Sequence, residues 1–256
     1  MAPEHQAGGA YDRIAHLYDV DMAQNMRFAD VDFYARIAQS KRGRALELGC
    51  GNGRILLELA ALGIDAVGVD RSQKMLAALF RKASACGLSV RACAMDVRQL
   101  GFAVRFDVVL CPYSLVTYMT DEDDAARMLE EAKCALAPDG IIVVDAFIRR
   151  GVDSSRDYTR DYERPLGERG SLVRSKRITP LSERVNRIER RYEIVSADGT
   201  IDERIDTCED IRVYTPSELT ALLEACGLRT REAWWNYATT DARADAQFFT
   251  VVAARA

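Results

Sequence analysis

Apolar and polar positions along the chain fall into blocks that predict strands separated by helices. A first helix is indicated near residues 11–18, because apolar side chains recur with helical spacing at Tyr11, Ile14, Ala15 and Tyr18. From residue 44 onward, short apolar runs predict buried strands at 44–49, 64–70, 88–94, 106–111 and 140–147. The segments between them predict helices at 54–62, 72–86 (with Ser72 as N-cap) and 121–137, and a turn at Pro138-Asp-Gly140. Strands that alternate with helices are typical of a parallel sheet covered on both faces.

The pattern changes after the fifth strand. Residues 148–170 are charged and contain glycine and proline, which predicts a loop or an irregular cover. Between residues 171 and 213 we expect three extended segments, because apolar and polar residues alternate there. The run Ala197-Asp-Gly-Thr200 is a hairpin-turn signal between the last two of them.

The last part of the chain returns to the helix and strand pattern. Thr215 is the expected N-cap of a helix with Pro216 in its first turn, and Gly227 is its expected C-cap. Strands near 228–236 and 247–254 follow. The predicted fold class is therefore α/β, with a Rossmann-like open sheet that is mostly parallel and has an antiparallel last strand. An antiparallel β insertion precedes the final helix.

We divide the chain into an N-terminal helical cap at 1–43, an α/β core at 44–147 and 214–256, and a β-rich insertion at 148–213. The insertion would serve as a substrate cover or a dimer contact. From Arg149 to Arg191 it holds 13 basic and 7 acidic residues. This bias would attract an anionic substrate, or it marks a solvated sheet face, and the pattern alone does not separate the two.

Charge balance and cysteine spacing narrow the class of protein. The net charge is −4, so the chain lacks the basic excess that is typical of nucleic-acid binders. No apolar run approaches the ~20 residues that span a bilayer, and the first residues lack the features of a signal peptide. We therefore expect a cytoplasmic protein without membrane or nucleic-acid partners. None of the seven cysteines forms a C-x-x-C pair, so we expect neither disulfides nor a metal site.

The strongest chemical signal is a glycine-rich run, Glu47-Leu-Gly-Cys-Gly-Asn-Gly53, between the first predicted strand and its helix. Glycines at such a turn let a ligand approach the backbone and leave helix N–H groups free. Two carboxylates follow at neighbouring strand ends, Asp70 after the second strand and Asp96 after the third. A carboxylate at the position of Asp70 accepts hydrogen bonds from ribose hydroxyls in folds of this kind.

Spacing and charge separate two classes of ligand for this run. A dinucleotide site requires G-x-G-x-x-G, but the sixth position is Arg54 when counted from Gly49 and Leu56 when counted from Gly51. A pyrophosphate would also meet the carboxylates at the strand ends, which have the wrong charge for an anion. S-adenosylmethionine has a sulfonium and an ammonium group and no phosphate. The acidic rim therefore favours S-adenosylmethionine.

Five motifs together resemble class I S-adenosylmethionine-dependent methyltransferases. They are Tyr11-Asp-x-x-Ala-x-x-Tyr18-Asp, the glycine-rich run, Val69-Asp70-Arg-Ser-x-x-Met75-Leu, Met95-Asp96-Val-Arg and Ala137-Pro-Asp-Gly140. The resemblance covers residues 11–147 well and the segment from 214 more loosely. The strand-rich insertion is similar to that of small-molecule N-methyltransferases of the amino-sugar and glycine types. The resemblance implies S-adenosylmethionine as cofactor and S-adenosylhomocysteine as product.

The resemblance also implies a set of site residues. Those expected at the cofactor are Tyr11, Tyr18, Glu47, Gly49, Cys50, Gly51, Gly53, Asp70, Arg71, Met75, Asp96, Val97 and Cys111. We expect Tyr18 and Tyr113 to position the reacting groups, and Tyr113, Tyr118 and Trp235 to shape the substrate pocket unless they belong to the core. Nucleic-acid amino-methyltransferases carry Asp/Asn-Pro-Pro-aromatic after the fourth strand. Here the run is Cys111-Pro-Tyr-Ser114, which argues against base methylation.

The sequence thus predicts a methyltransferase acting on a small molecule in biosynthesis, with N-methylation favoured over O-methylation. Direct displacement from an activated methyl group mainly requires alignment and exclusion of water, and a neutral amine needs little help from a base. Two alternatives stay open. One is an enzyme that uses S-adenosylmethionine for other chemistry, such as intramolecular cyclisation, and the other is a non-catalytic nucleoside-binding module. A homodimer through the β insertion is also expected.

Overall fold

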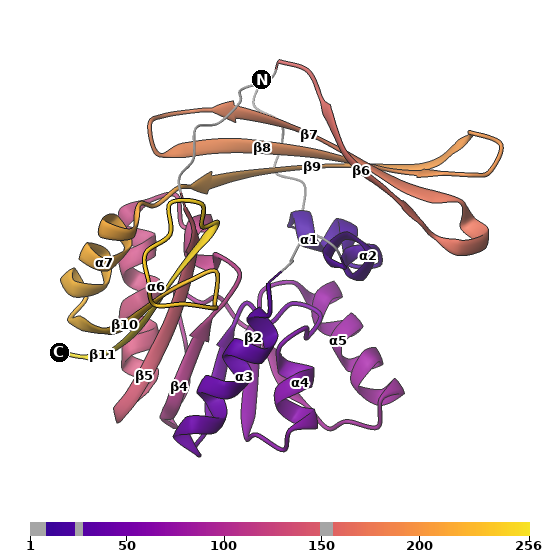
Figure 1. Ribbon diagram of the computed structural model, residues 1–256. Helices are drawn as coiled ribbons and strands as arrows, with labels where there is room; N and C mark the ends of the chain where they lie inside the picture. The colour runs from indigo at the N-terminus through magenta and orange to yellow at the C-terminus, as the bar shows by residue number, and fades with distance from the viewer. Residues whose placement is uncertain (1–8, 24–27, 149–155) are drawn as a thin grey trace.

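The computed structural model describes residues 9–23, 28–148 and 156–256, which form a large sheet with helices on both faces and a smaller sheet above it (Figure 1). The large sheet has seven strands in the order β10-β11-β5-β4-β1-β2-β3. Their bounds are β1 (Ala45–Leu48), β2 (Ala66–Asp70), β3 (Arg91–Ala94), β4 (Phe106–Cys111), β5 (Leu136–Phe147), β10 (Leu228–Trp235) and β11 (Phe248–Arg255). β11 runs antiparallel to both of its neighbours, and the other pairs are parallel. The predicted fold class is confirmed.

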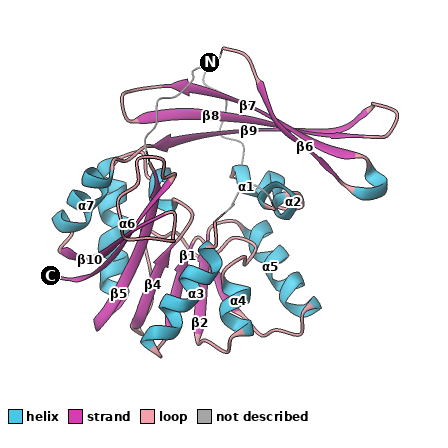
Figure 2. Cartoon of the chain, viewed as in Figure 1, coloured by secondary structure: helices cyan, strands magenta, loops and turns pink. Residues whose placement is uncertain are grey.

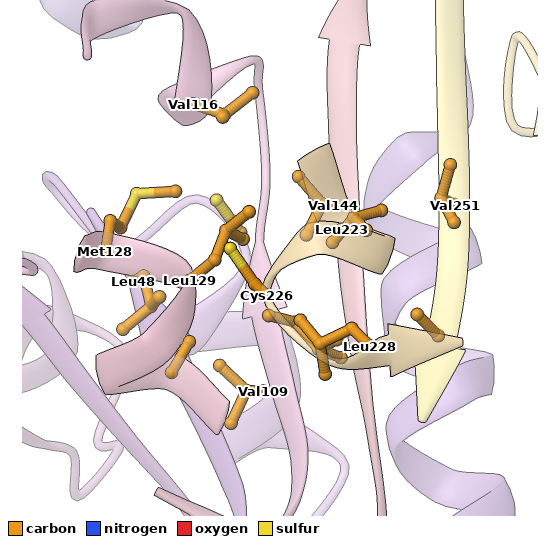
Figure 3. Close-up of a cluster of buried hydrophobic side chains, with 14 of the residues drawn as sticks. Leu48, Val109, Val116, Met128, Leu129, Val144, Leu223, Cys226, Leu228 and Val251 are labelled. Carbon is orange, nitrogen blue, oxygen red and sulfur yellow. The ribbon is translucent and has the colours of Figure 1, made fainter. Parts of the chain in front are cut away.

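Helices cover both faces of this sheet because its strands are apolar on both sides. One face carries α3 (Asp30–Lys41), α4 (Leu56–Ala61) and α5 (Gln73–Ala85), and the other carries α6 (Glu122–Ala135) and α7 (Pro216–Ala225). Figure 3 shows the core under α6 and α7, where Met128, Leu223 and Val251 are fully buried. This packing fixes the carboxyl ends of the parallel strands, where ligands of open α/β sheets bind.

The smaller sheet is antiparallel and has the strand order β6-β7-β8-β9. Its elements are β6 (Thr159–Pro165), the 3₁₀ turn η2 (Gly167–Arg169), β7 (Ser171–Pro180), β8 (Val185–Val195) and β9 (Ile201–Arg212). Two short helices, α1 (Ala10–Ile14) and α2 (Tyr18–Met22), lie between this sheet and the core (Figure 2). A 3₁₀ turn, η1 (Leu115–Tyr118), follows β4 and contacts β9.

Burial and charge both attach the short helices to the smaller sheet. Ile14 and Leu17 belong to one apolar cluster with side chains of the insertion, namely Leu172, Tyr192, Ile194 and Ile205. Asp21 is buried beside Arg174 and accepts hydrogen bonds from the hydroxyls of Tyr162 and Tyr192. The backbone carbonyl of Asp21 also accepts from Arg164. The helices therefore form part of the insertion's packing as well as a cover for the core.

Most predicted elements are confirmed, with boundaries shifted by a few residues. Ser72 and Thr215 cap their helices as expected, and Thr215 and Glu218 form a capping box. The predicted C-cap at Gly227 is one residue late, because Cys226 occupies it and Gly227 follows with φ 71°. The predicted turn at 138–140 lies inside β5, where the register with β4 shifts.

Two expectations about local structure are wrong. The single helix through residues 11–18 is interrupted, since the backbone N–H of Leu17 bonds the carbonyl of Ile14 in a tight turn. Neither piece is long enough to be stable alone, so packing on the insertion decides its course. The predicted loop at 148–170 contains β6, an edge strand whose Asp161 pairs with Arg174 and Lys176 on β7. The sequence did not indicate β6, because this edge strand has charged residues instead of alternating apolar and polar ones. Residues 149–155 of that predicted loop lie outside the described residues.

Helix α3 lies within the helical cap predicted at 1–43, but its own bounds were not predicted. Its Phe33, Tyr34 and Ala38 are buried against the sheet. Among the described residues, no helix has both the length and the apolar character needed to cross a bilayer.

Candidate active site

A cavity of about 1660 Å³ lies between the carboxyl ends of the parallel strands and the underside of the insertion. The glycine-rich run and the first helix form part of its lining, together with η1 and residues of β7, β8 and β9. Eleven of the predicted cofactor residues line it, namely Tyr11, Tyr18, Glu47, Gly49, Cys50, Gly51, Asp70, Arg71, Met75, Asp96 and Val97. Segments distant in sequence therefore meet at one edge of the sheet.

The glycine-rich run turns sharply at the end of β1. Gly49 and Gly51 have φ of 67° and 53°, a region that side-chain-bearing residues rarely adopt. The carboxylate of Asp70 braces the turn, because its Oδ2 accepts from the backbone N–H of Gly51 at 2.8 Å. Its Oδ1 accepts from the N–H of Ser72 at 2.7 Å. Each carboxylate oxygen has a second lone pair, so Asp70 keeps acceptor capacity toward the cavity.

Glu47 is the most unusual charged residue of the cavity. Its side chain is buried, and its Oε2 receives no hydrogen bond from any described residue. Burial, with the nearby charge of Asp70, raises the pKa of Glu47 to about 8, and Arg54 opposes the shift. Arg54 in turn pairs with the buried Asp30 at 2.7 Å. The deep end of the cavity thus presents a carboxyl group whose charged form gains from a cation.

Asp96 lies nearer the rim and is paired. Arg98 contacts Asp96 at 2.6 Å and Asp124 at 2.7 Å. The hydrogen bonds from Arg98 lower the pKa of the Asp96 carboxyl, so it stays ionised. Ser72 donates its hydroxyl to Asp12 of α1, which ties the first helix to this rim.

Four tyrosine side chains enclose the cavity from the insertion side. The hydroxyls of Tyr11 and Tyr118 are 2.6 Å apart, which joins α1 to η1. The Tyr18 ring stands edge-on to that of Tyr11, with centroids 5.9 Å apart. Tyr113 lies beside Arg54, whose guanidinium carbon is 5.7 Å from the ring centroid. Burial raises the pKa of each of the four hydroxyls, so these groups stay protonated at neutral pH.

Three predicted site residues are not brought to the cavity by the structure. Gly53 sits behind the turn, where an added Cβ would lie 2.2 Å from Leu79 Cδ1. Cys111 is fully buried in the core. Trp235 packs its ring on Phe249, with centroids 4.9 Å apart, at the border of the core under α6 and α7. Tyr113 and Tyr118 do line the cavity.

Sequence reasoning gave no role to two charged residues, Arg54 in the cavity lining and Asp145, which accepts from the backbone N–H of Tyr113. Arg54 follows the last glycine of the loop, and its pairing with Asp30 of α3 holds it in a partly buried position. Asp145 is fully buried near the end of β5. The signal for Asp145 was present, since it is a lone carboxylate within the apolar run 141–148.

Comparison with known proteins agrees with this geometry. The family described as "Methyltransferase domain" matches residues 45–140. A glycine/sarcosine N-methyltransferase of Halorhodospira halochloris is 29% identical over 164 residues, which cover 60% of each chain. The chain thus spans about 60% of the length of that relative. A dTDP-4-amino-2,3,4,6-tetradeoxy-D-glucose N,N-dimethyltransferase of Saccharopolyspora spinosa is 25% identical over 72% of this chain and 70% of its own.

Among solved structures, the CcbJ methyltransferase from Streptomyces caelestis is similar with a TM-score of 0.80. The match covers 97% of this chain and 98% of that one at 21% identity, so it shows a shared fold. The segment that matches the methyltransferase-domain family, residues 45–140, forms part of the Rossmann-like sheet. The predicted resemblance to class I S-adenosylmethionine-dependent methyltransferases, with N-methyltransferases among the relatives, is confirmed.

The residues present fit S-adenosylmethionine. The oxygen of Glu47 that receives no hydrogen bond can accept one from the cationic ammonium group of the cofactor. The positive-φ glycines have no side chain, so the cofactor can lie close to their backbone. Asp70 stands beside the loop with acceptor capacity for ribose hydroxyls. When bound, S-adenosylmethionine supplies an activated methyl group on sulfur.

Proposed function

We propose that this protein transfers a methyl group from S-adenosylmethionine to the nitrogen of a small-molecule amine. The observation that carries the proposal is the acidic, glycine-lined end of one cavity, with the buried carboxyl of Glu47 at its base. In this proposal Glu47 faces the cofactor's ammonium group and Asp70 its ribose. The four tyrosines exclude water and align the acceptor.

The preference for nitrogen follows from the protonation of the tyrosines that line the cavity. Tyr18 and Tyr113 have raised pKa values because they are buried, so they are poor bases at neutral pH. A hydroxyl acceptor needs a base at the moment of attack, whereas a neutral amine brings its own lone pair. Tyr18 and Tyr113 therefore act as positioning groups in this proposal.

The charge of the lining favours an amine without a strongly anionic group. Nine carboxylates and seven guanidinium groups line the cavity. Five of those guanidinium groups are ion-paired, and they belong to Arg54, Arg98, Arg177, Arg187 and Arg191. Such pairs leave little positive potential for a diphosphate. The charge bias seen in the sequence of the insertion is thus balanced by carboxylates on β8 and β9.

Two relatives suggest acceptors to compare, since their names refer to glycine and to a dTDP-linked amino sugar. A free amino sugar, glycine, sarcosine and the dTDP-linked sugar should be incubated with the protein and S-adenosylmethionine, alongside phenols and carboxylic acids. We expect S-adenosylhomocysteine to form with an uncharged or cationic amine. Methylthioadenosine as the product would support cyclisation chemistry instead. No turnover of any amine despite tight cofactor binding would contradict the proposal.

Cofactor placement has its own test. S-adenosylmethionine should be titrated calorimetrically into wild type and Asp70→Ala. Losing the ribose hydrogen bonds should weaken binding by roughly a hundredfold. Equal affinity would refute the role of Asp70, while Arg187→Ala, at the far wall of the cavity, serves as the matched control.

We also propose that two copies associate through the insertion, whose last strand, β9, carries exposed charged residues at Asp202, Glu203 and Arg204. Sedimentation of the full chain at micromolar concentration would test this, and a monomer throughout would reject it. The cytoplasmic location stays a prediction.

A further inference from the structure

Asp145 receives hydrogen bonds from three separate segments of the chain. The hydroxyl of Tyr34 on α3 donates to its Oδ2 at 2.6 Å, and the hydroxyl of Tyr237 donates at 2.5 Å. The backbone N–H of Tyr113 donates to the same oxygen at 3.0 Å, and that of Ser114 donates to Oδ1. A buried carboxylate is costly unless it is fully hydrogen-bonded, so this arrangement specifies one geometry.

The two backbone donors belong to a strained turn. Tyr113 and Ser114 have φ of 55° and 57°, and each non-glycine residue in that region costs on the order of 1 kcal/mol. In this conformation their successive N–H groups point to the same side and form a concavity suited to an anion. The carboxylate of Asp145 fills it. Among the described residues, Asp145 is the acceptor for both of these N–H groups, so the turn depends on its carboxylate.

The turn sets the wall of the cavity that faces the acceptor. Tyr113 and Leu115 line the cavity directly, and Tyr118 at the end of η1 does so too. We name these three residues the acceptor wall. The hydroxyl of Thr117 bonds the carbonyl of Ser114, which links η1 to the strained turn. One buried carboxylate therefore fixes the start of the segment that carries all three side chains.

The hydrogen bonds of Asp145 are separate from those that brace the glycine-rich run, although Leu115 of the acceptor wall lies against Gly49. Asp70 and its partners Gly51 and Ser72 brace the glycine-rich run, and among the described residues no hydrogen bond joins them to Asp145. Asp145 itself does not line the cavity. Its influence would thus reach the acceptor through the backbone of the turn.

We propose that Asp145 is a positioning residue that holds the acceptor wall in its active geometry, with Tyr34 and Tyr237 orienting its carboxylate. This proposal rests on the proposed function, because that function makes the acceptor wall the part of the cavity that contacts the methyl acceptor. Replacing Asp145 should disturb the positioning of the acceptor and lower the rate of methyl transfer. The affinity for the cofactor should stay almost unchanged.

The test compares Asp145→Asn with wild type in three measurements. An amide has one acceptor oxygen where the carboxylate has two, so at least one of the four hydrogen bonds is lost. We expect the amides of Tyr113 and Ser114 to exchange hydrogen about tenfold faster or more. The dissociation constant of S-adenosylhomocysteine, measured calorimetrically, should stay within about twofold. The kcat for the amine accepted by wild type should fall by about 30-fold or more.

Two further variants guard against a general loss of stability. Val251→Ala removes a fully buried side chain of β11 and leaves the turn untouched. It should destabilise the protein without changing the exchange of the Tyr113 and Ser114 amides. Tyr237→Phe removes one donor and keeps both backbone bonds, so it should lower kcat by only about threefold.

Each outcome decides one point. Unchanged amide exchange in Asp145→Asn, or an equal effect in Val251→Ala, would overturn the positioning role. A parallel loss of S-adenosylhomocysteine affinity would also overturn it, because the role is confined to the acceptor side. If wild type methylates no amine, the proposed function fails, while the exchange and calorimetric measurements still decide whether Asp145 holds the wall.

Discussion

The two sheets of this protein use charge in opposite ways. The seven-stranded sheet is apolar on both faces, and Glu47 brings to its edge a buried carboxyl oxygen that receives no hydrogen bond from the described chain. The four-stranded sheet carries rows of paired charges, namely Arg177–Glu189, Arg187–Asp210, Arg191–Asp206 and Arg204–Glu193. An unpartnered buried charge raises the free energy of the folded protein, whereas a paired exposed charge changes it little.

The difference in charge pairing suggests different roles for the seven-stranded core sheet and the four-stranded insertion. A rigid apolar core can hold strained and under-satisfied groups in place, and such groups give binding energy to a ligand that satisfies them. The insertion needs no such strain. It covers the cavity with a surface whose charges are largely paired, so we propose that it selects an acceptor by shape and by weak residual potential.

The largest effect is expected for Glu47→Gln, which removes the unsatisfied charge of the core. The folded chain holds the Glu47 proton up to a pKa of about 8, whereas the unfolded chain loses it near 4.5. The unfolded state therefore binds fewer protons between these values, and wild-type stability falls as pH rises through that window. At pH 8.5 the variant should be more stable by on the order of 4 kcal/mol, and the two should converge near pH 4.5.

Although Glu47→Gln should be more stable than wild type, it should bind S-adenosylmethionine more weakly. A cation favours the ionised carboxylate, so S-adenosylmethionine binding to wild type at pH 7 should release a proton that the variant lacks. The affinity of the variant should be about 30-fold lower. Calorimetry in two buffers with different ionisation enthalpies measures both quantities. A variant that is less stable than wild type at high pH would contradict the buried position of this charge.

The next effect compares apolar burial in the two regions. Leu223→Ala removes a fully buried side chain from α7 in the cluster of Figure 3, and it should cost about 3 kcal/mol. The same change at Leu181, which is 47% exposed between β7 and β8, should cost less than about 0.5 kcal/mol. Urea denaturation measures both. Similar losses would mean that the turn of the insertion is buried by a partner, as the proposed dimer would require.

A smaller effect tests the contact that closes the cavity. Tyr11→Phe removes one hydroxyl of the 2.6 Å pair with Tyr118 and should cost about 1 kcal/mol. Tyr118→Phe should cost the same, and the double variant should be clearly less destabilised than the sum of the two. The double-mutant cycle is measured by urea denaturation. Additive losses would show that the two hydroxyls do not interact.

The core could be predicted from the sequence because its signals are local. Apolar runs marked β1, β2, β4 and β5 within a few residues, and Ser72 and Thr215 marked helix starts through their own hydrogen bonds. β6 and α3 were not found because their stability depends on distant partners. β6 gains its place by pairing with β7, and α3 by burying Phe33 and Tyr34 against the sheet.

The residues of the site also divide into those with a local sequence signal and those that depend on distant partners. The glycine-rich run, Asp70 and Asp96 could be placed from their position at strand ends, because the order of a parallel sheet brings such ends together. Trp235, expected in the acceptor pocket or the core, packs on Phe249 and is not part of the cavity lining, since an aromatic residue at the end of a strand gives the same sequence pattern in both places. The role of Asp145 depends on donors from Tyr34 and Tyr237, about a hundred residues away on either side. Pairings at that separation leave no local pattern.

The smallest effect is expected for Arg187→Gln in the charge rows of the insertion. Arg187 and Asp210 are 39% and 35% exposed and 2.8 Å apart, so solvent screens their attraction. The variant should lose at most about 0.5 kcal/mol of stability at low salt, and the loss should vanish near 1 M salt. Since both residues line the cavity, the change also makes the lining more negative. A cationic amine should then bind slightly more tightly and an anionic acceptor more weakly, with no change in S-adenosylmethionine affinity. A loss of 2 kcal/mol or more would instead place this pair among buried, structure-determining contacts, and the distinction between the two sheets would fail.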